Sequence, residues 1–262
     1  MSTNPHTFPF GQPLKKVTQQ DRSPKQVFVL GVYASAVHAV WEGPDGKPLV
    51  RALAVASEPE IFWTGTDAAE IIKGIKIPKE AGRLLPAASN LNGPSGKLLD
   101  SHFLKPLGFT RKDAWLCDLL PESRMNMGQA KAISAKYNPV AETFKLPKAT
   151  IPPFTKSELK SKIRHLEILE ELEVSHAKTL ILLGDLPIAH FLIHFYPEFK
   201  TLSQFGKTSE TYGKKHRLTI NGKVYNVIPL CHPRQAGRLG ASDEDWEFLH
   251  NNWRNSISRS FA

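Results

Sequence analysis

The chain has 262 residues, of which 41% are hydrophobic and 23% are charged; this composition is typical of a globular protein with a real core and excludes a disordered chain. Lysine and arginine outnumber aspartate and glutamate by 34 to 25, a net charge of +9 that favours an anionic partner such as nucleic acid. Because the sequence has neither a run apolar enough to cross a bilayer nor the apolar core of a signal peptide, we expect a cytoplasmic protein without a membrane partner.

Both cysteines lie inside apolar runs. Cys117 stands in WLCDLL and Cys231 follows VIPL, so we expect two buried free thiols and no disulfide. Two cysteines are too few for a four-cysteine iron–sulfur cluster. We therefore expect no cofactor and no metal centre.

Residues 1–26 are rich in proline, threonine, glutamine and lysine without apolar periodicity, which predicts a flexible N-terminal arm. The following run, residues 27–30 (VFVL), is typical of a parallel strand that is buried on both faces. We expect Gly31 to end this strand, because glycine allows a sharp turn and a close approach of a ligand to the main chain.

Residues 32–38 are expected to form the loop after this strand, at the edge of the sheet where ligands bind in α/β proteins. Its polar residues have alternative roles. Tyr33 could line a ligand site or cover the core, and His38 could face the crevice or hydrogen-bond a neighbouring main chain. Ser35 and His38 at helical spacing could form a nucleophile and base, although no orienting acid accompanies them.

The next segments combine turns with short elements. We expect a turn at residues 43–46, a β-strand at 49–56 and a short helix at 66–75. Residues 82–96 contain several Gly, Pro, Asn and Ser, which predicts an irregular binding loop, and a helix is expected over 95–104.

Residues 115–120 (WLCDLL) form another apolar strand, which a single carboxylate, Asp118, interrupts. A buried charge is costly unless it has a partner or faces a site. Asp118 is therefore either a site residue or a structural partner, for example of the region around Arg234.

Residues 121–150 are polar and contain prolines, which predicts a surface excursion with a helix near 127–136. Thr155 and Glu158 form a capping-box pattern that predicts the start of the next helix. The apolar residues of that helix repeat at helical spacing and are expected to be its buried face: Leu159, Ile163, Leu166, Leu169 and Leu172.

The last third again alternates strands and helices. A strand at 179–183 and a short helix at 189–195 are followed by a hairpin over 216–230, indicated by Asn221-Gly222. The hairpin runs directly into Cys231-His232-Pro233. We expect Ser242 to cap a final helix with three residues on its apolar face: Trp246, Leu249 and Trp253.

Strands that alternate with helices predict an α/β fold with a mainly parallel sheet. The order of four segments also resembles the uracil-DNA glycosylase superfamily: the VFVLG strand, GPSGKLLDSHFLKPLGFTRKDAWLCDLLP, KTLILLGDLPIAHFL and VIPLCHPRQAGR. The similarity extends over most of residues 27–254. It implies one glycosylase-like domain, residues 27–262, with three α/β/α layers around a four-stranded, mainly parallel sheet.

The resemblance also implies roles. The loop after the first strand would hold the attacking water, Asp118 would bind the flipped base, and His232 would stabilise the negative charge on the departing base. The candidate catalytic residues are His232, His38 and Ser35. The candidate base-binding residues are Gly31, Tyr33, Asn92 and Asp118. The candidate DNA-binding residues are Ser95, Lys97, Arg234, Gln235 and Arg238.

We therefore expect a monomeric DNA glycosylase-like protein that binds DNA, including single-stranded or mismatched DNA, and flips a nucleotide. It would hydrolyse the N-glycosidic bond of a deaminated, uracil-type base in base-excision repair. The first loop departs from the family pattern, because residues 32–41 contain no carboxylate. Two alternatives follow: a catalytically impaired nucleic-acid-binding protein on the same fold, or a hydrolase of small molecules or nucleotides.

Overall fold

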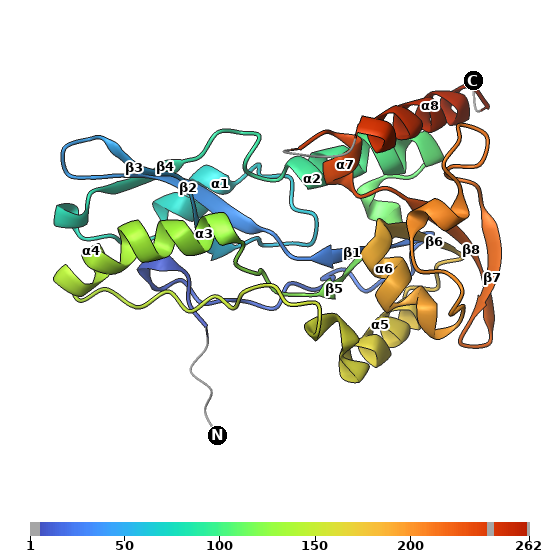
Figure 1. Ribbon diagram of the computed structural model, residues 1–262, viewed down its shortest axis with the longest axis horizontal. Helices are drawn as coiled ribbons and strands as arrows, with labels where there is room; N and C mark the ends of the chain where they lie inside the picture. Colours follow the sequence, from blue (N-terminus) through green and yellow to red (C-terminus); the bar gives the residue numbers. More distant parts are fainter. Residues whose placement is uncertain (1–5, 240–243, 261–262) are drawn as a thin grey trace. The chain divides into compact units, whose positions relative to one another are not determined.

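The computed structural model of the protein describes residues 6–239 and 244–260. The chain forms two compact units, each built from three segments that are far apart in the sequence (Figure 1). Unit 1 comprises residues 1–17, 33–94 and 121–155, and unit 2 comprises residues 18–32, 95–120 and 156–262. The range 27–262, which the sequence suggests as one domain, therefore contains segments of both units.

Unit 2 is built on a five-stranded sheet with the strand order β5-β1-β6-β8-β7. The strands are β1 (Val27–Tyr33), β5 (Ala114–Leu120), β6 (Thr179–Leu183), β7 (His216–Ile220) and β8 (Lys223–Leu230). β1 is parallel to β6 and β6 to β8, whereas β7 and β8 form an antiparallel hairpin. The predicted α/β fold with a mainly parallel sheet is confirmed, but β7 brings the strand number to five.

The direction of β5 follows from one hydrogen bond. The Gln26 N–H, just before β1, donates to the Asp113 carbonyl oxygen, just before β5, at 2.9 Å. The two strands thus begin side by side and run in the same direction. The last residues of β5, β1, β6 and β8 consequently point toward the same edge of the sheet.

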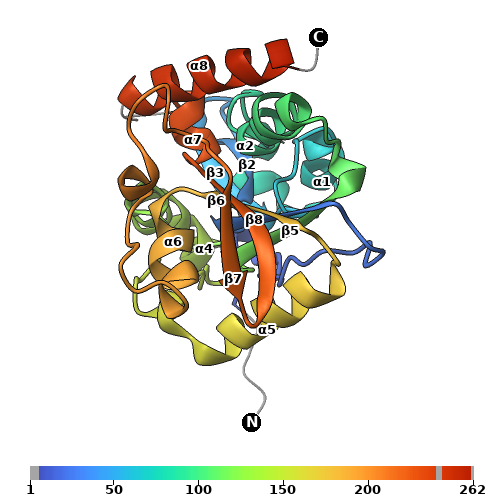
Figure 2. The ribbon, with the colours of Figure 1, turned by 90° about the vertical axis from the view of Figure 1, so that its right-hand side faces the viewer.

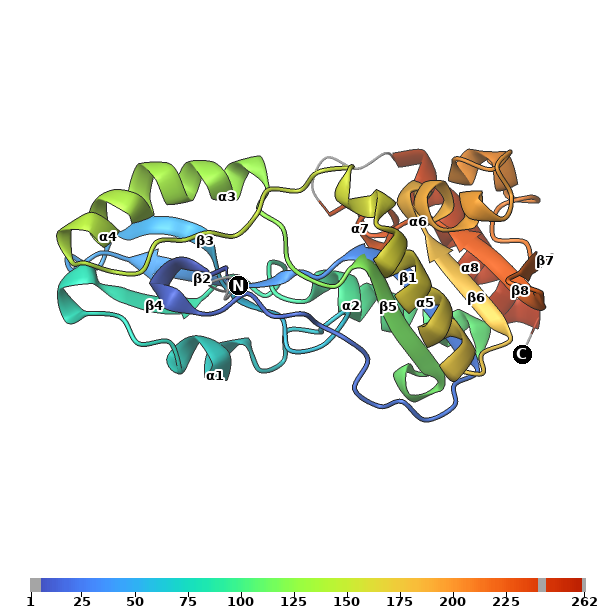
Figure 3. The same ribbon diagram turned by 90° about the horizontal axis from the view of Figure 1, so that it is seen from below.

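Helices lie on both sides of this sheet (Figures 1 and 2). One side carries α5 (Lys162–Val174), which in Figure 3 lies next to β5. The other side carries α8 (Glu244–Ser260) and α2 (Pro94–Leu98), which continues through a π-helical stretch (Leu99–Leu104) into a 3-10 turn (Lys105–Leu107). The short helices α6 (Asp185–His190) and α7 (Pro233–Ala236) follow β6 and β8 directly. This arrangement agrees with three α/β/α layers.

The apolar character of the central strands explains their position. Residues 27–30 of β1 and 180–183 of β6 are fully buried, as expected of parallel strands that are covered on both faces. The hairpin prediction is also confirmed. Asn221 and Gly222 have φ angles of 49° and 77°, the two positive values that a type I′ turn requires.

Unit 1 contains a separate antiparallel sheet with the order β3-β2-β4. Its strands are β2 (Ala36–Glu42), β3 (Pro48–Ser57) and β4 (Arg83–Pro86), and its helices are α1 (Ala68–Lys73), α3 (Met127–Ala132) and α4 (Asn138–Thr143). The core contains a ring cluster in which Phe10 packs against Trp41 and Tyr137 with centroid distances of 5.4 and 5.1 Å. The predicted strand at 49–56 and helix at 66–75 are confirmed, whereas β2 was not predicted and β4 lies in the stretch expected to be irregular.

The prediction of a flexible arm is wrong for residues 6–26, and residues 1–5 lie outside the described part of the chain. Phe8, Phe10 and Val17 are buried, and the Gln19 side chain accepts a hydrogen bond from Leu116 N–H at the edge of β5. These apolar residues follow no helical or strand period, so the pattern alone did not reveal their burial.

The surface excursion predicted for 121–150 is also wrong. Its helix forms as α3 and continues through a π-helical stretch (Ile133–Tyr137) into α4, but Ile133, Tyr137 and Ala141 belong to the core of unit 1. The Gln129 side chain binds both Ala54 N–H and Ala52 O, which satisfies the outer edge of β3.

Helix α5 begins later than predicted and turns a different face inward. Ser161 is its N-cap, not Thr155, and a 3-10 turn (Glu158–Lys160) precedes it. Ile163 and Leu166 have exposed fractions of 73% and 65%. Leu159 and Leu172 are buried as predicted, and the other buried positions are Arg164, Ile168 and Glu171.

At the C-terminus, Leu249 and Trp253 of α8 are buried as predicted, and Trp246 is half-buried. The predicted cap Ser242 lies outside the described residues. The short helix predicted at 189–195 begins earlier, at Asp185, and ends in a 3-10 turn (Leu192–His194).

Candidate functional site

His232 lies directly beyond the carboxyl end of β8, where it forms the N-cap of α7. Its Nδ1 accepts a hydrogen bond from Arg234 N–H at 3.1 Å, and its own N–H donates to Gln235 Oε1 at 3.0 Å. Burial, and secondarily the positive charge of Arg234, lowers the pKa of His232 to about 4. At neutral pH the imidazole is therefore neutral, and because Nδ1 is an acceptor, the proton is on Nε2.

A buried hydrogen-bond chain holds the main chain just before His232. Cys231 N–H donates to Tyr212 Oη at 2.9 Å, and Tyr212 Oη lies 2.8 Å from His250 Nδ1. His250 Nε2 lies 3.0 Å from the carbonyl oxygen of His102 and can only donate to it, so Nδ1 must accept from Tyr212. Burial lowers the pKa of His250 to about 3, which keeps the imidazole neutral.

Asp118 lies near the carboxyl end of β5 and is 2% exposed. Burial raises the pKa of its carboxyl to about 7; the Arg164 guanidinium opposes this rise, and the Glu171 carboxylate adds to it. The hydrogen bonds that Arg164 makes to Asp118 go to its main-chain carbonyl oxygen, from Nε at 3.2 Å and from Nη2 at 2.7 Å. The hydrogen bonds of Asp118 found within the described residues outside the sheet involve its main chain, and none reaches the side-chain carboxyl.

Arg164 also makes the buried ion pair of unit 2. Its Nη1 lies 2.9 Å from Glu171 Oε1, and the other Glu171 oxygen accepts from Trp115 Nε1 at 3.0 Å. Arg164 Nη2 contacts Cys117 Sγ at 3.0 Å. Since neighbouring side chains of a strand point to opposite faces, Cys117 faces α5 and the Asp118 carboxyl faces the other side of the sheet.

The predicted DNA-binding residues fall on two short helices of unit 2 that touch each other. A Cβ atom on Gly237, directly after α7, would lie 2.4 Å from Leu98 Cδ1 in α2, so the two helices pack closely at this point. Lys97 of α2 and Arg234 and Arg238 beside α7 are exposed. Arg238 also lies 3.4 Å from Glu247 of α8, and Arg234 Nε donates to Leu239 O. Ser95 and Gln235, the two remaining candidates, are half-buried.

Gly31 does not end β1, because the strand continues to Tyr33. That prediction is wrong: the main chain stays extended, and Gly31 is not among the described residues with a positive φ angle. Tyr33 is 39% exposed, and its ring packs against Phe154 with a centroid distance of 5.4 Å. The expected loop 32–38 is thereby reduced to a short connection between β1 and β2.

Ser35 and His38 both lie in unit 1, and their predicted helical spacing is wrong because residues 36–42 form β2. The Ser35 side chain is exposed. Burial lowers the pKa of His38, and its Nδ1 has no hydrogen-bond partner among the described residues. His38 is thus a neutral histidine whose ring nitrogen is unused within this part of the structure.

Asn92 has a structural role in unit 1. Its side-chain amide accepts from His38 N–H at 2.8 Å and donates to His38 O at 2.9 Å, which extends the pairing of β2 beyond the end of β4. Asn92 is 3% exposed. Both ends of this buried amide therefore pair with the main chain of His38.

A buried carboxylate that the sequence did not suggest contacts the first connection. Glu58 is 4% exposed, and its Oε1 accepts from Ser35 N–H at 2.8 Å. Ser123 Oγ donates to Ser35 O. The carboxylate that residues 32–41 lack is thus present beside Ser35, contributed from the end of β3.

The predicted site residues fall into two groups. Unit 1 holds Tyr33, Ser35, His38 and Asn92, and unit 2 holds Gly31, Ser95, Lys97, Asp118, His232, Arg234, Gln235 and Arg238. Tyr212, His250 and Arg164 were missed because their partners are distant in the sequence and no local motif marks them. Glu58 could have been found only as an acid at the end of a predicted strand.

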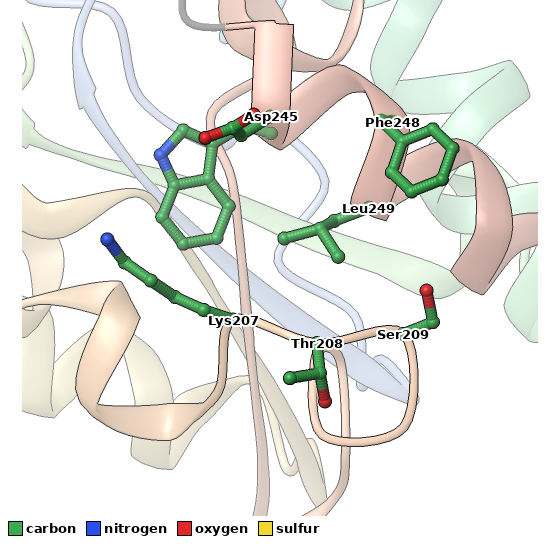
Figure 4. A pocket seen from close by; sticks show the side chains of 7 residues that line it. Lys207, Thr208, Ser209, Asp245, Phe248 and Leu249 are labelled. Atoms are coloured by element: carbon green, nitrogen blue, oxygen red, sulfur yellow. The ribbon is translucent and has the colours of Figure 1, made fainter.

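None of these residues lines the cleft of unit 2 that Figure 4 shows. It has a volume of about 460 Å³ and lies between the 207–209 loop and the start of α8; its lining is Lys207, Thr208, Ser209, Asp245, Trp246, Phe248 and Leu249. The candidate site of unit 2 is therefore at the strand ends and not in this cleft.

Within residues 6–239 and 244–260, no three or more His, Cys, Asp or Glu side chains are grouped so that they could bind a metal ion. In the same described part, no helix combines the length and apolar character needed to cross a membrane. The chain matches no protein-family model, and no curated protein is similar to it in sequence.

Proposed function

We propose that this protein is a DNA glycosylase-like enzyme, which flips a nucleotide out of DNA and hydrolyses the N-glycosidic bond of a uracil-type base. The observation that carries the proposal is His232, a neutral, rigidly oriented imidazole beyond the end of a parallel strand. The arrangement of the sheet, the position of Asp118 and the exposed cations Lys97, Arg234 and Arg238 support it.

The order of the sheet supports the resemblance in sequence. In chain order, the four strands that run in the same direction, β1, β5, β6 and β8, occupy the spatial order second, first, third, fourth. The crossover from β1 to β5 therefore runs opposite to that from β5 to β6, and a ligand crevice is expected at the switch point between β1 and β6. Asp118 and His232 lie on either side of it.

The chemistry of His232 fits the bond to be broken. Cleavage of an N-glycosidic bond leaves negative charge on the departing base, and a pre-oriented N–H donor stabilises this charge in a dry site. With Nδ1 engaged by Arg234 N–H, Nε2–H is the available donor. Removing such a donor costs on the order of 10²–10³ in rate.

The spacing of Asp118 and His232 is compatible with a base between them. Their strands are separated by β1 and β6, so the main chains lie roughly 14 Å apart at about 4.8 Å per strand. An Asp and a His side chain, each hydrogen-bonded to opposite ends of a six-membered ring, can span this distance. The exposed cations Lys97, Arg234 and Arg238 could then contact phosphates.

The deciding assay incubates the protein with single-stranded and duplex oligonucleotides that contain uracil, hypoxanthine or xanthine, and then cleaves abasic sites. We expect product from the uracil strand. His232→Ala should lower cleavage at least a hundredfold and change DNA affinity little, whereas His6→Ala, on an exposed histidine, should have no effect. No product from any substrate at excess protein would refute the catalytic proposal.

A second candidate, a DNA-binding protein without turnover, is favoured by the absence of a carboxylate in residues 32–41. Salt-dependent DNA binding without cleavage supports this second function. Cleavage of a uracil-containing strand contradicts it.

A further inference from the structure

We propose that Asp118 binds the flipped base as a neutral carboxylic acid, so that it donates one hydrogen bond to the base and accepts another. This inference rests on the proposed function and specifies both the substrate edge and its dependence on pH. Uracil-type bases carry a carbonyl oxygen next to an N–H group, and a neutral carboxyl offers the complementary pair, an O–H donor and a carbonyl acceptor.

The surroundings of the Asp118 carboxyl favour its neutral form. Asp118 is almost completely buried, and no hydrogen bond found within the described residues reaches its side-chain carboxyl. A carboxylate left ionised and unpaired in such a position is very costly, whereas a neutral acid costs far less.

The hydrogen bonds of the cation that acts on Asp118, Arg164, go to other groups than the Asp118 carboxyl. Arg164 directs two N–H groups to the Asp118 main-chain oxygen, and its other contacts go to Cys117 and to glutamates of α5. The charged and titratable groups that act on the Asp118 carboxyl are Arg164 and Glu171 of α5 and Cys117 of β5. Residues 27–32 of the neighbouring β1 carry no titratable side chain. None of these groups provides a donor to stabilise the ionised form.

The proposed reaction also favours a neutral Asp118. The base departs with negative charge, and an ionised Asp118 beside it would oppose the development of that charge. An ionised Asp118 would also face the lone pairs of the base carbonyl oxygen. Both effects disappear when the carboxyl is protonated, so the neutral form favours binding and cleavage.

The test compares kcat/KM on a uracil-containing single strand at about pH 6 and about pH 8.5. With a pKa near 7, the neutral fraction of Asp118 falls about thirtyfold between these values, and cleavage should fall by the same factor. His232, with a pKa of about 4, stays neutral throughout this range. Asp118→Asn carries an amide, which offers a donor and an acceptor at every pH. The kcat/KM of this variant at about pH 6 and at about pH 8.5 should therefore agree within about threefold.

Asp45→Asn, the same change at an exposed turn in unit 1, is the matched control and should keep the thirtyfold fall. An equally steep loss of activity in Asp118→Asn, or a flat profile in the wild type, would overturn the inference while leaving the glycosylase proposal intact.

A binding measurement decides the inference even if no cleavage occurs. Its probe is a single strand with 2′-fluoro-2′-deoxyuridine, which resists hydrolysis, compared with the same strand carrying a tetrahydrofuran abasic residue. We expect the wild type to prefer the base-containing strand at about pH 6 and to lose this preference at about pH 8.5, while Asp118→Asn retains it. Asp118→Leu, without donor or acceptor, should show no preference. A preference independent of pH, or its absence throughout, contradicts the inference.

Discussion

The ion pair between Arg164 and Glu171 should be one of the most stabilising side-chain interactions of unit 2. Both residues are less than a tenth exposed, and Nη1 and Oε1 are 2.9 Å apart. Glu171→Ala would leave a buried guanidinium without this counter-charge and would deprive Trp115 Nε1–H of its acceptor. Removing one member of a buried pair costs about 3–5 kcal/mol of unfolding free energy.

Equilibrium unfolding in urea, followed by circular dichroism and tryptophan fluorescence, measures this loss. Glu167 is the matched control, because it pairs with the same Arg164 Nη1 at the same 2.9 Å, but its side chain is 36% exposed. Exposed pairs contribute about 0–1 kcal/mol, so Glu167→Ala should have little effect. The double variant Arg164→Met with Glu171→Leu removes both charges and should be less destabilised than Glu171→Ala. Equal losses for Glu171→Ala and Glu167→Ala would refute this reasoning.

Two further predictions concern buried titratable groups. Because the pKa of Asp118 is raised in the folded protein, its neutral form stabilises the fold at low pH, and this stability is lost as the pH rises from about 4 to about 7. The free energy of unfolding of the wild type should fall by about 1.4 kcal/mol per pH unit relative to that of Asp118→Asn. If the unfolding free energies of the two proteins change in parallel over this range, the prediction is contradicted. Burial raises the pKa of Cys117 far above its usual range and that of Cys231 to about 12, so neither thiol should react with a disulfide reagent in the native state, and both should react in denaturant.

Local sequence patterns were enough to predict the central strands of unit 2. The apolar runs of β1 and β6 are short and unbroken, that of β5 is interrupted only by Asp118, and Asn221-Gly222 specifies its hairpin through two positive φ angles. Both signals arise within a few residues of each other. The α/β fold and the position of His232 at the end of β8 follow from these signals and were predicted correctly.

Unit 1 could not be predicted in the same way. β2 follows β1 after only two residues without a glycine or proline to mark a boundary, and its pairing with β3 and β4 is revealed only in three dimensions. Asn92 illustrates the consequence for the site. Its amide resembles a base-binding group in the sequence, but in the structure both of its ends bind the main chain of His38.

Helix α5 shows why apolar periodicity failed locally. Its Ile163 and Leu166 occupy predicted core positions but are exposed, whereas Arg164 and Glu171 are buried because they pair with each other and with Trp115. A periodicity argument treats every charged residue as exposed and cannot detect such a pair. The environment of Asp118, which depends on Arg164, was therefore also beyond the reach of the sequence.

The same physical cause shifts the two proposed base-contacting residues in opposite directions. Burial disfavours the charged form of each group, which lowers the pKa of His232 to about 4 and raises that of Asp118 to about 7. Below the lower value, protonation of His232 Nδ1 would break its bond from Arg234 N–H; above the higher value, Asp118 would carry a negative charge. On the proposed mechanism both groups are neutral only between these values, where they can bind an uncharged base and where the only negative charge that develops is the one His232 stabilises.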